Sequence, residues 1–174
     1  AIALLRVLLP EDPTPALLAK ASQLVESKHF TEAGKYYEQV IKVRPREALA
    51  IKGLERVKKE LEIQALLEKA EKQAETENYE QALNHCYDVL RIQPKNEKAK
   101  GLVDVIKSIG LAEAALEARN WTEAADLINK AMETYPESKL LTRYLEKARS
   151  EKNVAADLQR AKDNNQTYAA LLLE

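Results

Sequence analysis

The sequence has few of the residues that interrupt or cross-link a helical chain. Its 174 residues include only 4 Gly, 6 Pro and one cysteine. Because a single cysteine cannot form a disulfide within the chain, no covalent cross-link is expected. This cysteine usage favours a reducing compartment such as the cytoplasm, with a periplasmic or membrane-anchored protein as the open alternative.

The sequence also lacks a dominant charge and a long apolar run. There are 27 Lys and Arg residues against 28 Asp and Glu residues, so the net charge is −1. We expect no nucleic-acid partner, because such binders usually carry a basic excess or stripe. The apolar stretch of residues 1–9 is interrupted by Arg6 and is too short to span a bilayer, so we expect no membrane insertion by this chain.

Residue patterns for catalysis or metal binding are absent as well. Gly101 and Gly110 are isolated, so there is no glycine-rich phosphate loop. His85 and Cys86 are adjacent, which points them about 100° apart on a helix and excludes a compact nucleophile–base pair. We therefore expect no enzyme, no cofactor and no metal, and we interpret Cys86 as a buried core residue.

The residues that are abundant favour helix. Charged residues make up 32% of the chain and apolar residues 45%, with Glu, Lys, Ala and Leu dominant. That mixture is typical of helical proteins. Short β-branched runs such as Val40-Ile41 lie inside segments with helical spacing, so we predict an all-α fold without strands.

Three repeats follow one spacing rule. In each repeat two alanines and a proline are separated by twelve and twelve residues, and an aromatic residue precedes the middle alanine by three positions. The first Ala, the aromatic, the second Ala and the Pro are Ala21, Phe30, Ala33 and Pro45; Ala70, Tyr79, Ala82 and Pro94; and Ala112, Trp121, Ala124 and Pro136.

Each position in this rule suits a helix-turn-helix repeat. Small alanines allow two helices to cross closely, and the aromatic residue fills the gap between repeats. Thr31 and Thr122 are predicted N-caps of the second helix. The proline is predicted to end the second helix, because it lacks an amide proton and clashes with the preceding turn.

The pattern resembles the tetratricopeptide repeat (TPR) family, and roughly residues 16–136 match it. The resemblance implies an α-solenoid whose first helices line a concave groove. It also implies a protein-interaction scaffold or adaptor that binds a peptide or helix of a partner protein. Co-chaperone members grip a terminal carboxylate with Lys, Asn and Arg. Because Ser22, Glu71 and Glu113 stand on the comparable face here, a chaperone-tail receptor is not expected.

The repeats are farther apart than the family's period of about 34 residues. Ala33 and Ala82 are separated by 49 residues, and Ala82 and Ala124 by 42, which are excesses of 15 and 8 residues. These excesses equal about four and two helical turns, so the buried face stays in phase. We therefore predict lengthened helices between repeats, with an extra helix per repeat as the alternative.

Three regions are predicted along the chain. Residues 1–15 form an apolar helix and a Pro-rich linker. Residues 16–136 hold the repeats, and residues 137–174 form a C-terminal capping helix and an apolar tail. The repeats are placed at about 16–45, 64–94 and 106–136, and the sequence DNNQ at 163–166 is predicted to interrupt the capping helix.

The candidate partner-binding residues lie on the first helix of each repeat. Positions one and five residues after the first alanine share a helix face, and they carry Glu in the second and third repeats. Apolar neighbours give an acidic row beside an apolar floor, which we expect to bind a basic or basic-amphipathic segment. The candidates are Glu26, Leu67, Glu71, Glu75, Ile109, Glu113, Leu116 and Glu117. The alternative function is a self-assembly module in which the apolar terminal helices form a homo-oligomer.

Overall fold

The structure is a computed structural model that describes residues 12–171, with side chains described as far as residue 164. Every regular element in this range is an α-helix, which confirms the all-α prediction. The predicted apolar helix at residues 1–9 lies outside the described residues. The helices are α2 (Thr14–Glu26), α3 (Phe30–Val43), α4 (Ala48–Glu75), α5 (Tyr79–Ile92), α6 (Glu97–Glu117), α7 (Trp121–Thr134) and α8 (Lys139–Leu171).

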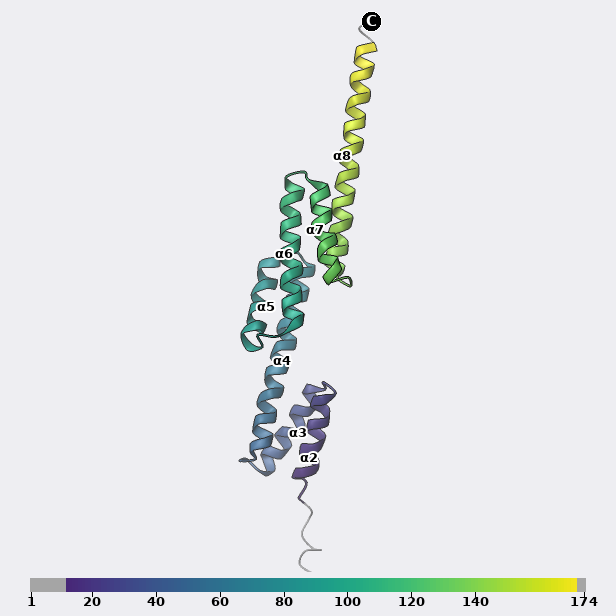
Figure 1. Ribbon diagram of the computed structural model, residues 1–174. Coiled ribbons are helices and arrows are strands. Elements are labelled where there is room, and N and C mark those ends of the chain that lie inside the picture. Colours follow the sequence, from purple (N-terminus) through teal and green to yellow (C-terminus); the bar gives the residue numbers. More distant parts are fainter. Residues whose placement is uncertain (1–11, 172–174) are drawn as a thin grey trace, which may run out of the picture. The chain divides into compact units, whose positions relative to one another are not determined.

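The chain divides into two compact parts, Ala1–Leu66 and Leu67–Glu174, and α4 contributes residues to both. In the N-terminal part, α2 packs against α3. In the C-terminal part, α5 packs against α6, α6 against α7, and α7 against α8 (Figure 1). Within each part, consecutive helices are therefore neighbours, as expected for helix-turn-helix repeats.

The same tight turn joins the two helices of every repeat. Lys28, Glu77 and Arg119 have φ values of 61°, 62° and 58°, which is the left-handed region. The next amide donates back to a carbonyl of the first helix, as in the 2.8 Å bond from His29 N to Leu24 O. This hydrogen bonding is the Schellman motif, which satisfies the last carbonyls of the first helix.

The predicted N-caps of the second helices are wrong. Because α7 begins at Trp121, Thr122 lies inside its first turn, and Thr31 likewise lies inside α3. In α7 the cap is Asn120, whose side-chain oxygen accepts a hydrogen bond of 3.4 Å from the Glu123 amide. The aromatic residue of the repeat is thus the first helical residue, and the residue before it takes the cap position.

The predicted ends of the second helices are confirmed. Helices α3, α5 and α7 each end two residues before their proline, at Val43, Ile92 and Thr134. The predicted lengthening of the first helices is also confirmed, because α4 and α6 are single helices of 28 and 21 residues. The additional residues between repeats are therefore extra turns of helix rather than extra helices.

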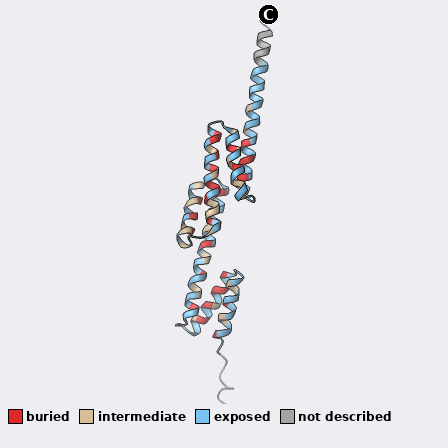
Figure 2. Cartoon of the chain, in the orientation of Figure 1, coloured by how far each residue is buried: buried red, intermediate tan, exposed pale blue. Residues whose placement is uncertain are grey.

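Each lengthened helix begins by covering the repeat before it. The residues five and twelve positions after each proline are buried in all three cases (Figure 2). In the first case the backbone of α4 approaches α3 so closely that a Cβ on Gly53 would collide with the Tyr37 ring. The rest of the helix then serves as the first helix of the next repeat. The covering residues are Ala50 and Val57 in α4, Ala99 and Ile106 in α6, and Leu141 and Ala148 in α8.

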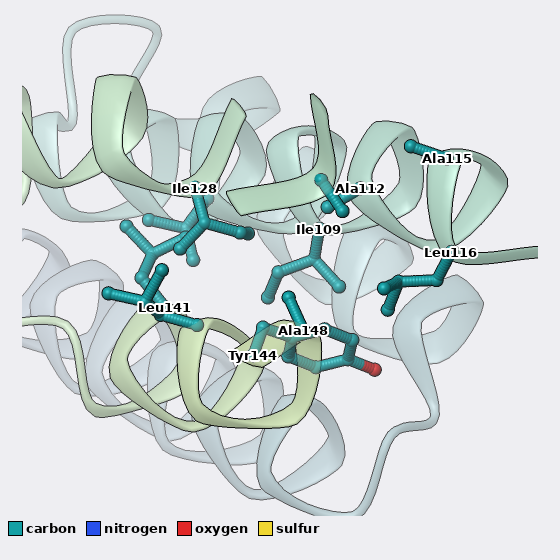
Figure 3. Packing of buried hydrophobic residues seen from close by; sticks show 11 residues of the cluster. Ile109, Ala112, Ala115, Leu116, Ile128, Leu141, Tyr144 and Ala148 are labelled. Carbon is teal, nitrogen blue, oxygen red and sulfur yellow. The ribbon is translucent and has the colours of Figure 1, made fainter. Parts of the chain in front are cut away.

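The largest core lies in the C-terminal part, among α6, α7 and α8. Figure 3 shows Ile109 of α6, Ile128 of α7 and Leu141 of α8, which belong to one buried cluster, and each has 0% of its surface exposed. The ring of Tyr144 is also in this core and is 2% exposed. Burying side chains of this size contributes about 1.5–3 kcal/mol each, so this core fixes the first half of α8 against α6 and α7.

The predicted break at residues 163–166 is wrong, because α8 continues as helix to Leu171. Asp and Asn are weak helix formers, but helix propagation past one weak turn costs little once the helix is established. The turn is also supported by a 2.8 Å hydrogen bond from the Gln159 side-chain amide to the Asp163 carboxylate, four residues later.

Candidate protein-binding cleft

A cleft of about 610 Å³ opens in the C-terminal part where α4, α6 and the start of α8 come together. Each of these helices is the first helix of a repeat or covers the repeat before it. We call this feature the acidic cleft. It is lined by Glu71, Glu75, Leu102, Glu137, Ser138, Lys139, Leu140 and Arg143.

An adjoining hollow extends the acidic cleft towards the end of α7. The two share Glu71 and Leu102, and the hollow reaches Gly101 and Tyr135. A Cβ on Gly101 would lie 3.1 Å from the Tyr135 ring, so the glycine allows this ring to sit close to α6. The Tyr135 hydroxyl donates a 2.9 Å hydrogen bond to Asp104, and this bond to a carboxylate raises the pKa of Tyr135.

Carboxylates outnumber cations along the acidic cleft. Glu71, Glu75 and Glu137 face two cations, Lys139 and Arg143. None of the three carboxylates forms a salt bridge with a described residue. Glu71 and Glu75 are one helical turn apart and both exposed, so their charges are available to a cation from outside.

Arg143 is held by the turn between α4 and α5. One of its guanidinium nitrogens lies 3.2 Å from the Glu77 carboxylate, and another donates a 3.3 Å hydrogen bond to the Glu75 carbonyl. The guanidinium of Arg143 therefore already interacts with groups of this chain. The remaining charges of the acidic cleft are mostly negative. The same contacts tie α8 to the end of α4.

The floor of the acidic cleft is apolar. Leu102 and Leu140 are half-buried, and both pack against the cluster of Ala74, Ala82 and Ile106. Because this cluster is fully or almost fully buried, the two leucines are supported from below. They therefore present a fixed apolar surface between the carboxylates of α4 and the start of α8.

A chain of hydroxyls lies behind the acidic cleft and fixes α8 to α6. Tyr79 donates a 2.8 Å hydrogen bond to the Tyr144 hydroxyl, which donates a 2.6 Å bond to the Glu113 carboxylate. Burial, followed by the bond to Glu113, raises the pKa of Tyr144. Burial likewise raises the pKa of Tyr79. Glu113 thus accepts a hydrogen bond from within the chain.

The structure distributes the candidate residues over several places. Glu71 and Glu75 line the acidic cleft. Leu67, on the same helix, is half-buried. The other five lie elsewhere: Ile109 and Leu116 are 0% and 8% exposed and belong to the core, Glu113 is bonded to Tyr144, Glu117 lines a different cleft, and Glu26 is exposed on α2 in the N-terminal part.

Six residues that line the cleft were not among the candidates: Leu102, Glu137, Ser138, Lys139, Leu140 and Arg143. Of these, Leu102, Leu140 and Arg143 lie in the helices that cover the preceding repeat. The prolines could have predicted these positions, because Leu102 follows Pro94 by eight residues and Arg143 follows Pro136 by seven. Counting forward from each proline would have placed them on the covering turns.

Cys86 lies next to the acidic cleft but is not part of it. It is fully buried, as predicted. Burial, and to a smaller extent the charge of Glu71, raises the pKa of Cys86 to about 11, which keeps the thiol protonated near neutral pH. Within the described residues, no group of three His, Cys, Asp or Glu side chains is placed to hold a metal ion. No described helix is long and apolar enough to cross a membrane.

Comparisons with known proteins give a likeness among solved structures alone. No family model and no curated protein matches the chain. Among solved structures, it is similar to the C-terminal TPR-containing domain of a protein described as an FK506-binding protein of Plasmodium falciparum. The two are 17% identical with a TM-score of 0.30, and the match covers 83% of this chain and 91% of that chain. Since a score this low does not establish a shared fold, the repeat assignment rests on the spacing and helices of this chain.

Proposed function

We propose that this chain is a protein-interaction scaffold, and that its acidic cleft binds a partner segment carrying basic residues beside apolar ones. The observation that carries the proposal is the pairing of two exposed, unpaired carboxylates, Glu71 and Glu75, with an apolar floor at Leu102 and Leu140. A basic side chain would meet the carboxylates while an apolar side chain covers the leucines.

The shape of the acidic cleft supports an elongated partner. The adjoining hollow continues past Leu102 to Tyr135, so a bound segment has room to extend along α6. Amphipathic helices bind grooves of this kind through apolar anchors three and four residues apart. The excess negative charge supplies attraction and orientation, which depend on ionic strength.

The test is a binding titration with a fluorescent, helical peptide made of Lys and Leu with one apolar face. We expect the double variant Glu71→Lys, Glu75→Lys to weaken binding by about tenfold or more, which is about 1.4 kcal/mol. The matched control is Glu80→Lys, which reverses an exposed carboxylate in the first turn of α5. We expect this control to change the affinity by less than about twofold.

Two further measurements separate charge from shape. A peptide with Glu in place of every Lys is expected to bind weakly, because it would meet carboxylates of the same sign. Raising the salt concentration is expected to weaken binding of the basic peptide. Equal affinity of the double variant and the unchanged chain for the basic peptide would refute the proposal.

A further inference from the structure

The residue pattern that forms the buried face of the first helix occurs four times in this chain, although only three complete repeats are present. Each copy begins with Thr, Ile or Val, has Leu or Ile four positions later, and has Ala three positions after that. The four copies are Thr14, Leu18 and Ala21; Ile63, Leu67 and Ala70; Val105, Ile109 and Ala112; and Val154, Leu158 and Ala161. The fourth lies in the second half of α8, where the spacing rule of the repeats had placed nothing.

The first three copies are covered by other helices. Ala21, Ala70 and Ala112 each have 0% of their surface exposed. Ala21 shares a core cluster with Ala33 of α3, and Ala112 shares one with Ala124 of α7. In the first and third repeats, therefore, the alanine of the first helix is buried in the same cluster as the alanine of the second helix.

The fourth copy is uncovered. Val154 and Leu158 are 56% and 59% exposed, and Ala161 is exposed as well. In Figure 2 the part of α8 that holds this copy is mostly in the colour of exposed residues, and no other helix of the C-terminal part runs beside it. A cleft of about 520 Å³ lies between Val154 and Leu158 on one side and Leu116 and Trp121 on the other. Its apolar wall continues the core of α6, α7 and α8.

The helices that cover the first three copies share a simple chemistry. Each has an alanine at the crossing point and apolar or small residues four and seven positions later. All nine side chains are buried or half-buried. They are Ala33, Tyr37 and Val40 in α3; Ala82, Cys86 and Val89 in α5; and Ala124, Ile128 and Ala131 in α7. The alanine allows the helix axes to approach closely. The side chains four and seven positions later fill the groove between the helices.

The charges around the fourth copy are balanced. Glu117 and Glu151 carry negative charge at the edge of this cleft, and Arg119 and Lys162 carry positive charge. Binding there would be driven by burial of apolar surface, which depends little on ionic strength. This property distinguishes the face from the acidic cleft.

We propose that the second half of α8 binds an amphipathic helix from a separate polypeptide, in the position that α3, α5 and α7 occupy in their own repeats. The bound helix carries Ala or Gly at the crossing point and apolar residues four and seven positions later. Val154, Leu158, Leu116 and Trp121 form the surface it covers. This proposal does not depend on the function of the acidic cleft.

The experiment uses the α7 sequence, residues 121–134, as a fluorescent peptide stapled into a helix on its polar side. We expect saturable binding to the complete chain that changes little with salt. Leu158→Glu is expected to weaken binding by about tenfold or more, because a charge would be buried against the peptide. The matched control is Leu111→Glu, since Leu111 is 61% exposed on α6 but lies outside this cleft.

Four additional measurements make the test independent of a single variant. A peptide with Ala124→Trp is expected to bind at least about tenfold more weakly, because the bulky ring prevents close crossing of the helices. Val154→Ser should also weaken binding, and circular dichroism should show unchanged helix content in all three chain variants. Charge reversal at Glu71 and Glu75 should leave binding of this peptide unchanged, which separates it from the acidic cleft.

The proposal is overturned by any of three results. The first is no saturable binding of the α7 peptide up to about 1 mM, a free energy of about −4 kcal/mol. The second is binding that Leu158→Glu leaves unchanged. The third is a dimer in sedimentation velocity that Leu158→Glu dissociates and the peptide does not, because a second copy of the chain would then be the occupant.

Discussion

At the scale of single residues, two glycines in long helices sit in opposite surroundings. Gly53 in α4 lies under the buried ring of Tyr37, so a Cβ there would overlap the ring. Gly110 in α6 is exposed, and a Cβ there would meet nothing within 4 Å. Both occupy helix interiors, where glycine is unfavourable for the backbone. Only at Gly53 does packing give a reason for its presence.

We therefore expect alanine to have opposite effects at these two positions. Gly110→Ala should raise the free energy of unfolding by about 0.5–1 kcal/mol through helix propensity. Gly53→Ala should lower it by about 1–3 kcal/mol, because Tyr37 must move within a packed core. Urea denaturation followed by circular dichroism measures both. Two changes of the same sign would contradict the packing of α4 on α3.

The Tyr79–Tyr144–Glu113 chain predicts a loss of stability at alkaline pH. Burial raises the pKa of Tyr144 and Tyr79 in the folded chain, whereas in the unfolded chain both have the usual value of about 10. Above that pH the unfolded chain releases these protons and the folded chain retains them, so the free energy of unfolding falls as pH rises. Denaturation between pH about 8 and about 11 measures the slope.

Tyr144→Phe provides the matched control for that slope. The ring stays in the core, but the hydrogen bonds to Tyr79 and Glu113 are lost, so we expect a cost of about 1 kcal/mol near pH 8. The alkaline loss of stability should also become smaller, because one retained proton is removed. An unchanged slope would mean that Tyr144 is not the group that holds its proton.

At the scale of helices, α6 shows why the candidate site was only partly predictable. The spacing of Ala112 and Trp121 was sufficient to place a helix and its turn. It did not determine which face of the helix points outward. Ile109 was expected in a groove and lies in the core, because α8 packs against α6 and covers that face. The covering helix is far away in sequence, so no local pattern revealed it.

A comparison of two positions on α6 tests this assignment. Ile109 is fully buried, whereas Leu111, two residues later, is 61% exposed. Ile109→Ala should lower the free energy of unfolding by about 2–5 kcal/mol, since it leaves a cavity among α6, α7 and α8. Leu111→Ala should change it by less than about 0.5 kcal/mol. Similar effects of the two substitutions would show that α8 does not cover this face.

The long helices themselves were predictable because their extra length is close to whole turns. Excesses of 15 and 8 residues keep the apolar face in phase, and few helix-breaking residues interrupt them. The packing of their first turns on the preceding repeat was not predicted, although Ala50, Ala99 and Leu141 each follow a proline by five residues. The spacing of the alanines and the aromatic residue locates the turn inside each repeat, whereas these positions are defined by their distance from the proline.

At the scale of the whole molecule, each long helix takes part in two repeats. The first half of α4 closes the core of the N-terminal part at Ala50 and Val57. Its last turns contribute Ala74 to a core of the C-terminal part and Glu71 and Glu75 to the acidic cleft. The acidic cleft thus depends on the extra helical turns that separate one repeat from the next. Its carboxylates were predictable from sequence, whereas its apolar floor was not.

We propose above all that a basic amphipathic segment binds in the acidic cleft. The most direct test is amide chemical-shift mapping by NMR as the unlabelled Lys–Leu peptide is added to the labelled chain. We expect the largest changes at Glu71, Glu75, Leu102 and Leu140, with little change at Glu26 of α2. No saturable change at those four residues, or changes centred on Val154 and Leu158, would contradict it.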